Sequence, residues 1–295
     1  MKKIIAMSLI AAMGLSLVAC GQEAEAPAET TETAEATEAA AETTETAEAT
    51  EAAAETEEAV SENAASDAAG KHWVVASDTV FKPFEYTDEN GDFVGIDVDI
   101  LAAIAEDQGL DYEIQSLGWD AAIAACQAGQ ADGMIAGASI TDERKDSGWI
   151  FSDGYYNATQ TMTVKSDSDI KGFEDLQGKD VAVKTGTQGA AYAESLMEQY
   201  GFNIVYFEDS PTMYQAVAGG QAVACFEDTP IMKASIQEGG LDLTVLDDTA
   251  NEGAPYGFAV FSEDNQALVD AFNAGLANIK ANGKYDEIIA KYLGN

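Results

Sequence analysis

Segments with strand character and segments with helix character alternate along residues 71–295. The predicted strands are short apolar runs at 73–77, 111–117, 133–136, 180–184, 203–207 and 223–227. Between them lie stretches with helical spacing at 97–108, 121–128, 188–200 and 210–218, and a further helix begins at Thr229-Pro230. Gly109 and Gly201 follow two of these helices, where glycine commonly ends a helix. This alternation predicts an α/β fold with mostly parallel sheets.

The first 20 residues have the character of a secretory signal. Two lysines give a positive start, and residues 4–18 are apolar but too few to span a bilayer comfortably. The stretch Leu17-Val18-Ala19-Cys20-Gly21 resembles the bacterial lipobox, where cleavage leaves a lipid-modified cysteine at the new N-terminus. We therefore predict that residues 1–20 are a lipoprotein signal peptide and that Cys20 carries acyl chains such as palmitate, which would anchor the protein stably. The alternative is an ordinary signal peptide with an incidental cysteine.

Residues 21–70 consist almost entirely of Glu, Ala and Thr, and residues 28–40 recur unchanged at 41–53. The segment has no aromatic residue and, apart from Val60, no large apolar one. It therefore buries too little surface to offset the entropy of ordering the chain. We predict a disordered, acidic tether, which as a flexible coil of this length would span roughly 40 Å r.m.s..

Acidic residues dominate the whole chain, whose formal net charge is −39 at pH 7. The tether has 15 acidic residues and no basic one, and residues 71–295 have 38 acidic residues against 12 lysines and arginines. A domain of this charge is a poor partner for nucleic acid and is repelled by anionic lipid. We expect the lipid at Cys20, and not the surface of the domain, to bring the protein to the membrane.

The remaining cysteines and the single histidine do not form a metal-binding or catalytic pattern. Cys126 lies in a predicted helix, Cys225 in a predicted strand, and His72 at the start of the domain. Their spacing matches neither a zinc site nor a catalytic cysteine. We interpret both cysteines as buried thiols, and we expect no metal and no cofactor.

The chain has one arginine, Arg144, among 13 lysines. A planar guanidinium can hold a carboxylate through two parallel hydrogen bonds, which a lysine cannot do. A surface arginine paired with an acidic neighbour is the alternative. However, Gly137, Ser139 and Thr141 precede Arg144 in a turn of small residues that leads into a short helix, and such a turn leaves room for a ligand.

Polar or small residues follow four of the predicted strands. They are Asp78, then Gly137 and Ser139, then Lys184, and finally Glu227 with Asp228. Each alone is commonly a cap or a turn residue. In open α/β sheets, however, ligands bind beyond the carboxyl ends of the strands, near helix N-termini. Four such positions together favour a binding site.

Several ordered motifs resemble the bacterial extracellular solute-binding proteins of family 3, the amino-acid receptors of ABC importers. The motifs are the segments 78–86, 95–100, 140–145, 151–156 and 282–288. The resemblance runs from about Trp73 to Leu293. It implies a two-lobed periplasmic-binding-protein-like fold of type II, with a mostly parallel sheet and flanking helices in each lobe.

The resemblance also implies how the chain is divided between the lobes. Lobe 1 is expected at 71–156 and again at 257–295, and lobe 2 at 160–252. A two-segment hinge is expected near 155–159 and 252–256. The sequence alone gives no sign of this discontinuity.

The groups that hold the backbone of an α-amino acid are likewise implied by the resemblance. Arg144 is expected to bind the carboxylate, together with amides around Thr187 and Gln188. The ammonium is expected to be held by Asp228, the Gly137 carbonyl and the Ser139 hydroxyl. Phe81 and Trp119 correspond to aromatic residues that cover the ligand. Core packing is the alternative for Trp119, but its neighbours have the composition of a loop, which favours exposure to a cleft.

Three charged residues bear on the choice of ligand side chain. Asp78 and Lys184 match glutamine-binding members of the family, in which an acid accepts from the amide NH₂ and a lysine donates to the amide oxygen. Glu227 stands where those receptors have a histidine. It either adds acid that favours a basic ligand or pairs with Lys184. Glutamine is therefore the leading prediction, with another polar or a basic amino acid as the alternative.

These observations predict a monomeric, lipid-anchored receptor on the extracytoplasmic face of the bacterial membrane. It would close on a free L-amino acid and deliver it to the permease of an ABC importer. A periplasmic dehydratase on the same fold is a weaker hypothesis, because the groups for an α-amino acid form a complete set. A sensory input module is also weaker, because the chain ends at Asn295, directly after the domain.

Overall fold

A computed structural model describes residues 68–294. The predicted signal peptide, the tether and the lipidation site at Cys20 lie outside the described residues. Within residues 68–294, no helix is both long and apolar enough to cross a bilayer. The same part of the chain contains no group of three or more His, Cys, Asp or Glu side chains arranged to hold a metal ion.

The first sheet, which we call the sheet of lobe 1, has five strands. In spatial order they are β5 (Asp111–Ser116), β1 (His72–Ser77), β6 (Gly133–Met134), β15 (Ala259–Val260) and β7 (Ile150–Phe151). Strand β1 is parallel to both of its neighbours, and β15 is antiparallel to β6 and β7. The last strands of this sheet thus come from chain segments more than 100 residues apart.

The second sheet, the sheet of lobe 2, also has five strands. In spatial order they are β11 (Asn203–Phe207), β10 (Asp180–Lys184), β12 (Ala224–Asp228), β9 (Gln160–Lys165) and β13 (Leu243–Leu246). Strands β11, β10 and β12 are parallel, and β9 runs against β12 and β13. One strand opposes the other four in each sheet, so the predicted α/β fold with mostly parallel sheets is confirmed.

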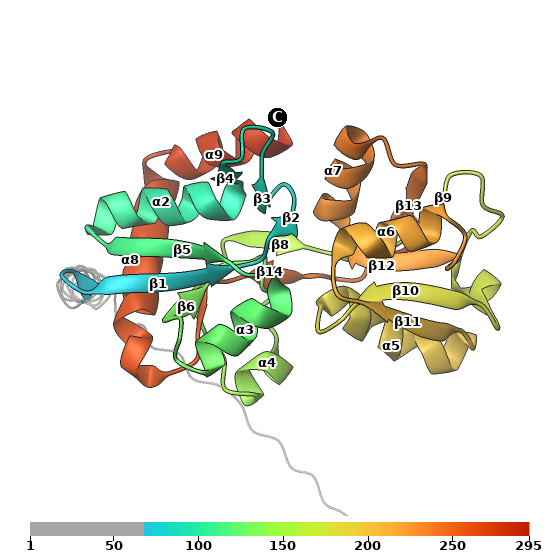
Figure 1. The fold of residues 1–295 in the computed structure, drawn as a ribbon, viewed down its shortest axis with the longest axis horizontal. Coiled ribbons are helices and arrows are strands. Elements are labelled where there is room, and N and C mark those ends of the chain that lie inside the picture. The colour runs from blue at the N-terminus through green and yellow to red at the C-terminus, as the bar shows by residue number, and fades with distance from the viewer. Residues whose placement is uncertain (1–67, 295) are drawn as a thin grey trace, which may run out of the picture. The chain divides into compact units, whose positions relative to one another are not determined.

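Helices cover both faces of each sheet (Figure 1). Those of lobe 1 are α2 (Ile96–Gln108), α3 (Trp119–Gln127), α4 (Asp142–Asp146), α8 (Gln266–Ala281) and α9 (Lys284–Leu293). Those of lobe 2 are α5 (Gln188–Tyr200), α6 (Ser210–Ala218) and α7 (Thr229–Gly239). Short 3₁₀ turns lie at Phe173–Leu176, Asp247–Thr249 and Glu263–Asn265.

The two-residue period of a strand explains how a sheet supports two cores. On β10, Val181 and Val183 pack into the core beside α5, and Ala182 between them packs into the core beside α6 and α7. Buried strands of this kind carry apolar residues on both faces, as parallel sheets require. The same pattern places Cys225 in one of these cores. Cys225 and Cys126 are free and buried in different lobes, so the prediction of buried thiols is confirmed.

Two segments connect the lobes, and they pair with each other. Strand β8 (Tyr156–Ala158) is antiparallel to β14 (Ala254–Tyr256).

A separate three-stranded sheet follows β1 in lobe 1. It is made of β2 (Val80–Phe81), β3 (Glu85–Thr87) and β4 (Phe93–Val94).

One local prediction is wrong. Trp119 is not in a loop but is the first residue of α3, because the helix starts two residues before the predicted 121–128. Gly118, with φ 91°, takes the backbone conformation that turns the chain into the helix. The indole is buried and packs against the core beside α3.

Candidate functional site

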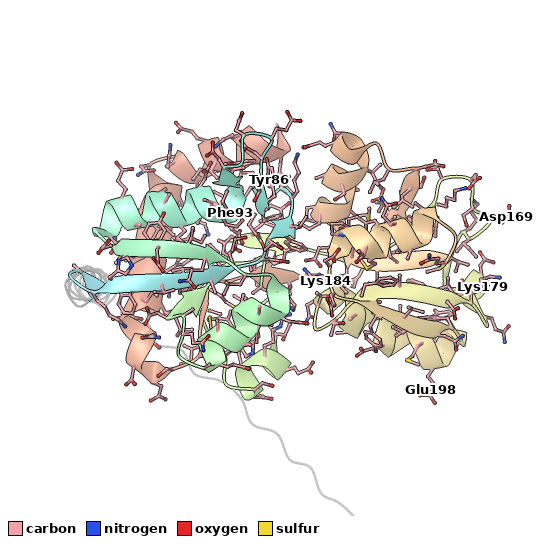
Figure 2. The ribbon with its side chains drawn as sticks, in the orientation of Figure 1. Tyr86, Phe93, Asp169, Lys179, Lys184 and Glu198 are labelled. Atoms are coloured by element: carbon pink, nitrogen blue, oxygen red, sulfur yellow. The ribbon has the colours of Figure 1, made fainter. Side chains whose placement is uncertain are left out.

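One cavity is lined by residues of both lobes. The lining residues are Asp78, Phe81, Trp119, Ala136, Gly137, Ser139, Arg144, Lys184, Thr187, Gln188, Glu227 and Asp228. All eleven residues predicted to contact a ligand are among them, and Ala136 is the addition. The cavity leaves about 20 Å³ for water-sized occupants, which is room for about one water molecule. In Figure 2, Lys184 lies on the side of lobe 2 that faces lobe 1, whereas Asp169 and Lys179 lie at the far end.

The strand ends bring these side chains together. Asp78 directly follows β1, Lys184 is the last residue of β10, and Glu227 and Asp228 end β12. The parallel strands of each lobe therefore present their carboxyl ends, and the polar residues there, to the cavity. Gly137 has φ 55°, and a Cβ atom at this position would lie 2.6 Å from the Phe81 ring. Glycine is thus required where the loop after β6 passes the ring.

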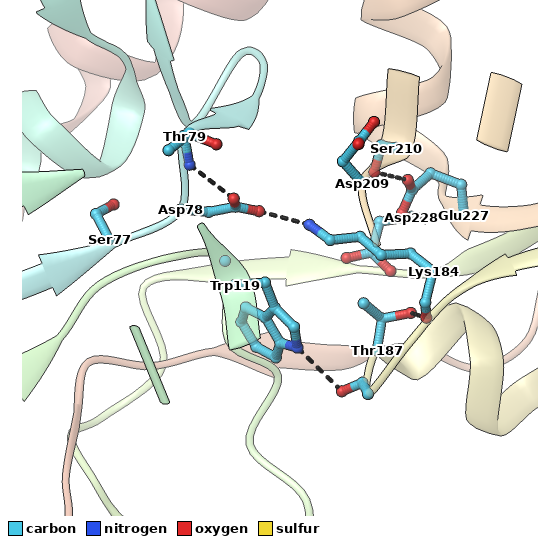
Figure 3. A network of polar contacts seen from close by, with 12 residues as sticks. Ser77, Asp78, Thr79, Trp119, Lys184, Thr187, Asp209, Ser210, Glu227 and Asp228 are labelled. Carbon is cyan, nitrogen blue, oxygen red and sulfur yellow. Dashed lines mark hydrogen bonds and ion pairs between the residues drawn. The ribbon is translucent and has the colours of Figure 1, made fainter. Parts of the chain in front are cut away.

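A buried ion pair joins the lobes across the cavity (Figure 3). The Nζ atom of Lys184 lies 2.5 Å from Oδ2 of Asp78, and both side chains are less than a tenth exposed. The other oxygen of Asp78 accepts a hydrogen bond from the backbone N–H of Thr79 at 2.6 Å. A buried pair needs this kind of additional hydrogen bonding, because each charge loses most of its hydration.

Arg144 and Trp119 make a second set of contacts between the lobes. The guanidinium donates to the Ser139 carbonyl at 2.8 Å and to the Gly186 carbonyl of lobe 2 at 3.3 Å. The Trp119 indole N–H donates to the same Gly186 carbonyl at 3.3 Å. The guanidinium carbon lies 5.1 Å from the ring centroids of Trp119 and Trp149. The Gly186 carbonyl was not predicted, because backbone acceptors leave no mark in a sequence.

The local structure fixes the position of Arg144. Thr141 caps the five-residue helix α4 by accepting a hydrogen bond from the backbone N–H of Arg144. This confirms the predicted turn of small residues before a short helix. Burial lowers the pKa of Arg144 to about 10, and the charge of Asp228 opposes that shift. The guanidinium is therefore protonated at neutral pH and can hold an anion.

Asp228 accepts hydrogen bonds from residues at both connections between the lobes. One carboxylate oxygen accepts from the Gln160 side chain, which begins β9 directly after the first connection. The other oxygen accepts from the Tyr256 hydroxyl, at the end of β14 in the second connection. Burial and the charge of Glu227 raise the pKa of Asp228 to about 7, although these hydrogen bonds and Arg144 oppose the shift. Sequence reasoning missed Gln160 and Tyr256.

Glu227 is held by donors of its own lobe. Its Oε2 atom accepts from the Ser210 hydroxyl at 2.7 Å and from the Tyr214 hydroxyl at 2.8 Å, and Oε1 accepts from the backbone N–H of Asp228 at 2.9 Å. Burial and the charge of Glu227 raise the pKa of Tyr214. The alternative that Glu227 pairs with Lys184 is not what the structure shows, since Lys184 instead pairs with Asp78.

Thr187 and Gln188 stand at the start of α5. The Thr187 side chain caps the helix by accepting from the backbone N–H of Ala190, and its hydroxyl donates to the Lys184 carbonyl at 2.8 Å. The first backbone N–H groups of a helix have no partner within the helix, so they are suited to bind an anion. Arg144 and the start of α5 thus supply donors from opposite sides of the same cavity.

Comparison with known proteins gives one consistent family. The sequence profile of the bacterial extracellular solute-binding proteins, family 3, matches residues 73–295. A probable histidine-binding protein of Neisseria gonorrhoeae is 32% identical over 238 residues, which cover 79% of this chain and 87% of that protein.

Solved structures agree with the sequence comparison. Substrate binding domain 2 of Lactococcus lactis GlnP, in an open conformation, is 38% identical and superposes with a TM-score of 0.54 over 76% of this chain and 96% of that domain. Two structures of an ancestral arginine-binding protein, one bound to arginine and one to glutamine, are 33% and 34% identical. Each has a TM-score of 0.70 and covers 76% of this chain and 98% of the other. The ancestral protein thus superposes better on this chain than the GlnP domain does, although its sequence is less similar.

Proposed function

The chain belongs to the bacterial extracellular solute-binding proteins of family 3, and from this premise we propose that it captures a free, polar L-amino acid for an ABC importer. The observation that supports the proposal is that one cavity contains two opposite charges, one from each lobe. A buried guanidinium, Arg144, lies on lobe 1, and a buried carboxylate, Asp228, lies on lobe 2. An α-amino acid has a carboxylate for the first and an ammonium for the second, so that no buried charge is left alone.

Binding requires the lobes to separate and close again. The cavity has room for about one water molecule and not for an amino acid, so the ligand enters when the Lys184–Asp78 pair and the contacts to Gly186 are broken. Closure around the ligand then replaces these direct contacts with contacts through the ligand. We infer that β8 and β14 are the hinge, because they are the paired connections between the two sheets. Ligand contacts from both lobes would shift the open–closed equilibrium toward the closed form.

We propose glutamine as the first candidate ligand. Its side-chain NH₂ can donate to Asp78 while its oxygen accepts from Lys184, so the amide bridges the two groups that now form an ion pair. Glu227 already accepts three hydrogen bonds from its own lobe, so its capacity for a guanidinium is reduced. The binding of glutamine by the ancestral arginine-binding protein supports an amide ligand on a closely similar fold.

A basic amino acid is the second candidate, and the charge of the cavity favours it. With all groups ionised, Arg144 and Lys184 face Asp78, Glu227 and Asp228, so one negative charge remains when a neutral ligand is bound. A lysine or arginine side chain would cancel that charge. Lys184 opposes this, because it would place a second cation close by in a desolvated cleft.

The site gives little support to a dehydratase. Lys184 and Glu227, the pair that could move a proton, have separate partners in the structure. Incubation with prephenate or arogenate would yield an aromatic product if this alternative were correct. We therefore propose a receptor and not an enzyme.

Delivery to a permease and attachment to the membrane complete the proposal. We propose that lipid at Cys20 holds the monomeric protein on the extracytoplasmic face of the membrane, with residues 21–70 as the tether. Replacement of Cys20 by Ser should abolish incorporation of radiolabelled palmitate. Continued labelling of that variant would show that the lipobox interpretation is wrong.

A thermal-shift screen of the purified full-length protein against all proteinogenic amino acids tests the proposed function. A ligand at a hundred times its Kd should add about 2.7 kcal/mol to the free energy of unfolding. The Arg144→Lys protein is the control, because lysine keeps the charge but loses the two-pronged contact with a carboxylate. No amino acid should raise the unfolding temperature of this variant. If no amino acid stabilises the wild type, the proposal fails.

A further inference from the structure

Two acidic side chains of lobe 1, Glu85 and Asp97, are completely buried. Glu85 begins β3, and Asp97 lies in the first turn of α2. One oxygen of Asp97, Oδ2, accepts two hydrogen bonds, from the backbone N–H of Gly137 at 2.8 Å and from the Tyr155 hydroxyl at 2.9 Å. Gly137 lines the cavity, and Tyr155 directly precedes the first connection between the lobes. Asp97 therefore joins the site to the start of that connection.

The other carboxyl oxygens of this pair have no donor from elsewhere. Within residues 68–294, both oxygens of Glu85 and the Oδ1 atom of Asp97 are buried, and no other group donates a hydrogen bond to them. Two ionised carboxylates cannot stay together in such a place. A proton on Glu85 resolves the problem, because a carboxylic acid can donate to Asp97. Burial and the charge of Asp97 raise the pKa of Glu85, and burial raises the pKa of Asp97 to about 6.

The charged groups around Glu85 come from three other elements. Asp97 faces it from α2, Asp78 from the end of β1, and Lys184 from the end of β10 in lobe 2. The two aspartates favour the protonated form of Glu85, and Lys184 opposes it. The Tyr155 hydroxyl faces Asp97 before β8, and burial raises its pKa, so it is a neutral donor. The proton of the buried pair is thus electrostatically coupled to the ion pair in the cavity.

We propose that Glu85 and Asp97 share one proton, and that this acid pair positions Gly137 in the ligand site and Tyr155 at the start of the connection between the lobes. The inference rests on the proposed function, since Gly137 is expected to contact the ligand ammonium. The backbone N–H of Gly137 donates to Asp97 at 2.8 Å, and this hydrogen bond holds the Gly137 peptide in place at the cavity wall. Glu85 and Asp97 are positioning residues and do not line the cavity.

Infrared spectroscopy of the wild-type protein tests the shared proton directly. A protonated carboxyl group gives a C=O stretching band that a carboxylate lacks. The difference spectrum of wild type against Glu85→Gln should contain this band at pH 7, and the band should persist when the pH falls to 5. Absence of the band at pH 7 would overturn the proposal, whatever the protein binds.

The affinity for glutamine tests the positioning role. Glu85→Gln keeps a donor toward Asp97, so its affinity should stay within about two-fold of wild type at pH 7. Glu85→Leu removes the donor, and its affinity should fall about ten-fold, the equivalent of one lost hydrogen bond. Thr163→Val is the matched control, because Thr163 is also buried with an unpartnered hydroxyl but lies in the sheet of lobe 2. It should bind like wild type. Equal affinity of folded Glu85→Leu and Glu85→Gln would overturn the positioning role.

The pH profile separates positioning from a general effect on folding. As the pH rises, Glu85 loses its proton in wild type but the amide of Glu85→Gln cannot. The ratio of wild-type to Glu85→Gln affinity should therefore fall over the pH range in which the infrared band of Glu85 disappears, and titration of the ligand amine cancels in this ratio. A ratio that stays constant while the band is lost would contradict the proposal. If Glu85→Leu does not fold, the infrared band and this ratio still decide. If wild type binds no amino acid, the proposed function fails, but the infrared result stands separately.

Discussion

Each lobe contains a pair of buried acids close to the cavity, but the two pairs are surrounded differently. Glu227 and Asp228 in lobe 2 accept hydrogen bonds from hydroxyl, amide and backbone donors. Glu85 and Asp97 in lobe 1 have donors for a single oxygen, Oδ2 of Asp97. Protein donors stabilise carboxylates, whereas their absence favours a proton. The pair in lobe 2 therefore has donors for the ionised form that a ligand ammonium needs, although burial and the charge of Glu227 raise the pKa of Asp228 to about 7. The pair in lobe 1 is suited to hold the structure in place.

The same substitution in each pair gives the sharpest test of this difference. Asp228→Asn removes the charge that faces the ligand ammonium, and we expect it to cost about 2–5 kcal/mol of binding free energy. Asp97→Asn keeps a carbonyl oxygen for Gly137 and Tyr155, so its cost should be about 1 kcal/mol or less. Calorimetric titration of both variants with the ligand found in the screen measures the two costs. Equal losses of binding free energy in the two variants would show that the two acid pairs do not differ in this way.

The pH dependence of binding should follow the pair in lobe 2. The pKa of Asp228 is raised to about 7 in the protein without ligand, and the ligand ammonium needs the ionised form. Below pH 7, each binding event therefore releases a proton from Asp228. The affinity should fall about ten-fold for each unit by which the pH is lowered. Titrations between pH 5 and pH 8 in buffers of different ionisation enthalpy detect the released proton. An affinity that stays constant over this range would contradict the assignment of Asp228.

Stability without ligand should change in the opposite direction. The pKa of Asp228 in the folded protein lies above its ordinary value, so the folded state binds this proton more tightly than the unfolded state. The stabilisation is therefore complete below about pH 4 and is lost as the pH rises through about 7. Urea unfolding should show that the free energy of unfolding of Asp228→Asn increases relative to that of wild type as the pH rises from about 4 to about 7. A difference independent of pH would show that Asp228 does not titrate there.

Lys184 should influence selectivity more than backbone recognition. Lys184→Met removes the ammonium that pairs with Asp78, so the cavity becomes more negative. The ratio of affinities for arginine and glutamine should then rise by about ten-fold or more, which is at least about 1.4 kcal/mol. Competition between the two ligands in calorimetry measures this ratio. An unchanged ratio would exclude Lys184 from side-chain selection.

The smallest effect is expected at the rim of the cleft. Lys82 of lobe 1 pairs with Glu238 of α7, and both side chains are more than a third exposed. Exposed pairs contribute about 0–1 kcal/mol, so Lys82→Ala should change the ligand affinity no more than about five-fold. This contrasts with the buried Lys184–Asp78 pair, which also joins the lobes. A larger loss in Lys82→Ala, measured by the same titration, would mean that the rim contributes to closure as much as the cavity does.

The strands, the helices and the residues that line the cavity could be predicted from the sequence better than the contacts between those residues. Residues at the carboxyl ends of parallel strands, such as Asp78 and Lys184, are predictable because the topology of an α/β sheet brings these ends together. The direct pairing of those two residues was not predicted, because it depends on how far the lobes close. Trp119 was misplaced because the glycine before it was interpreted as part of a loop, although it leads into a helix.

The acid pair of lobe 1 was missed for a different reason. Glu85 and Asp97 lie within the segments 78–86 and 95–100 that carry the family resemblance, but an isolated acid in a sequence is ordinarily a surface residue. Their burial arises from the packing of β3 against α2, which brings residues twelve positions apart into contact. The flanking Phe84 and Ile96, both fully buried, are the signal that could have indicated it.

Titration of the full-length wild-type protein with glutamine, arginine and lysine in a calorimeter tests the central claim most directly. We expect glutamine to bind with one-to-one stoichiometry and more tightly than arginine or lysine, because its amide satisfies both Asp78 and Lys184. Tighter binding of arginine or lysine would show that Asp78 and Glu227 outweigh Lys184 and that the protein is a basic amino-acid receptor. Absence of binding by all three, together with a negative screen, would show that the protein is not an amino-acid receptor.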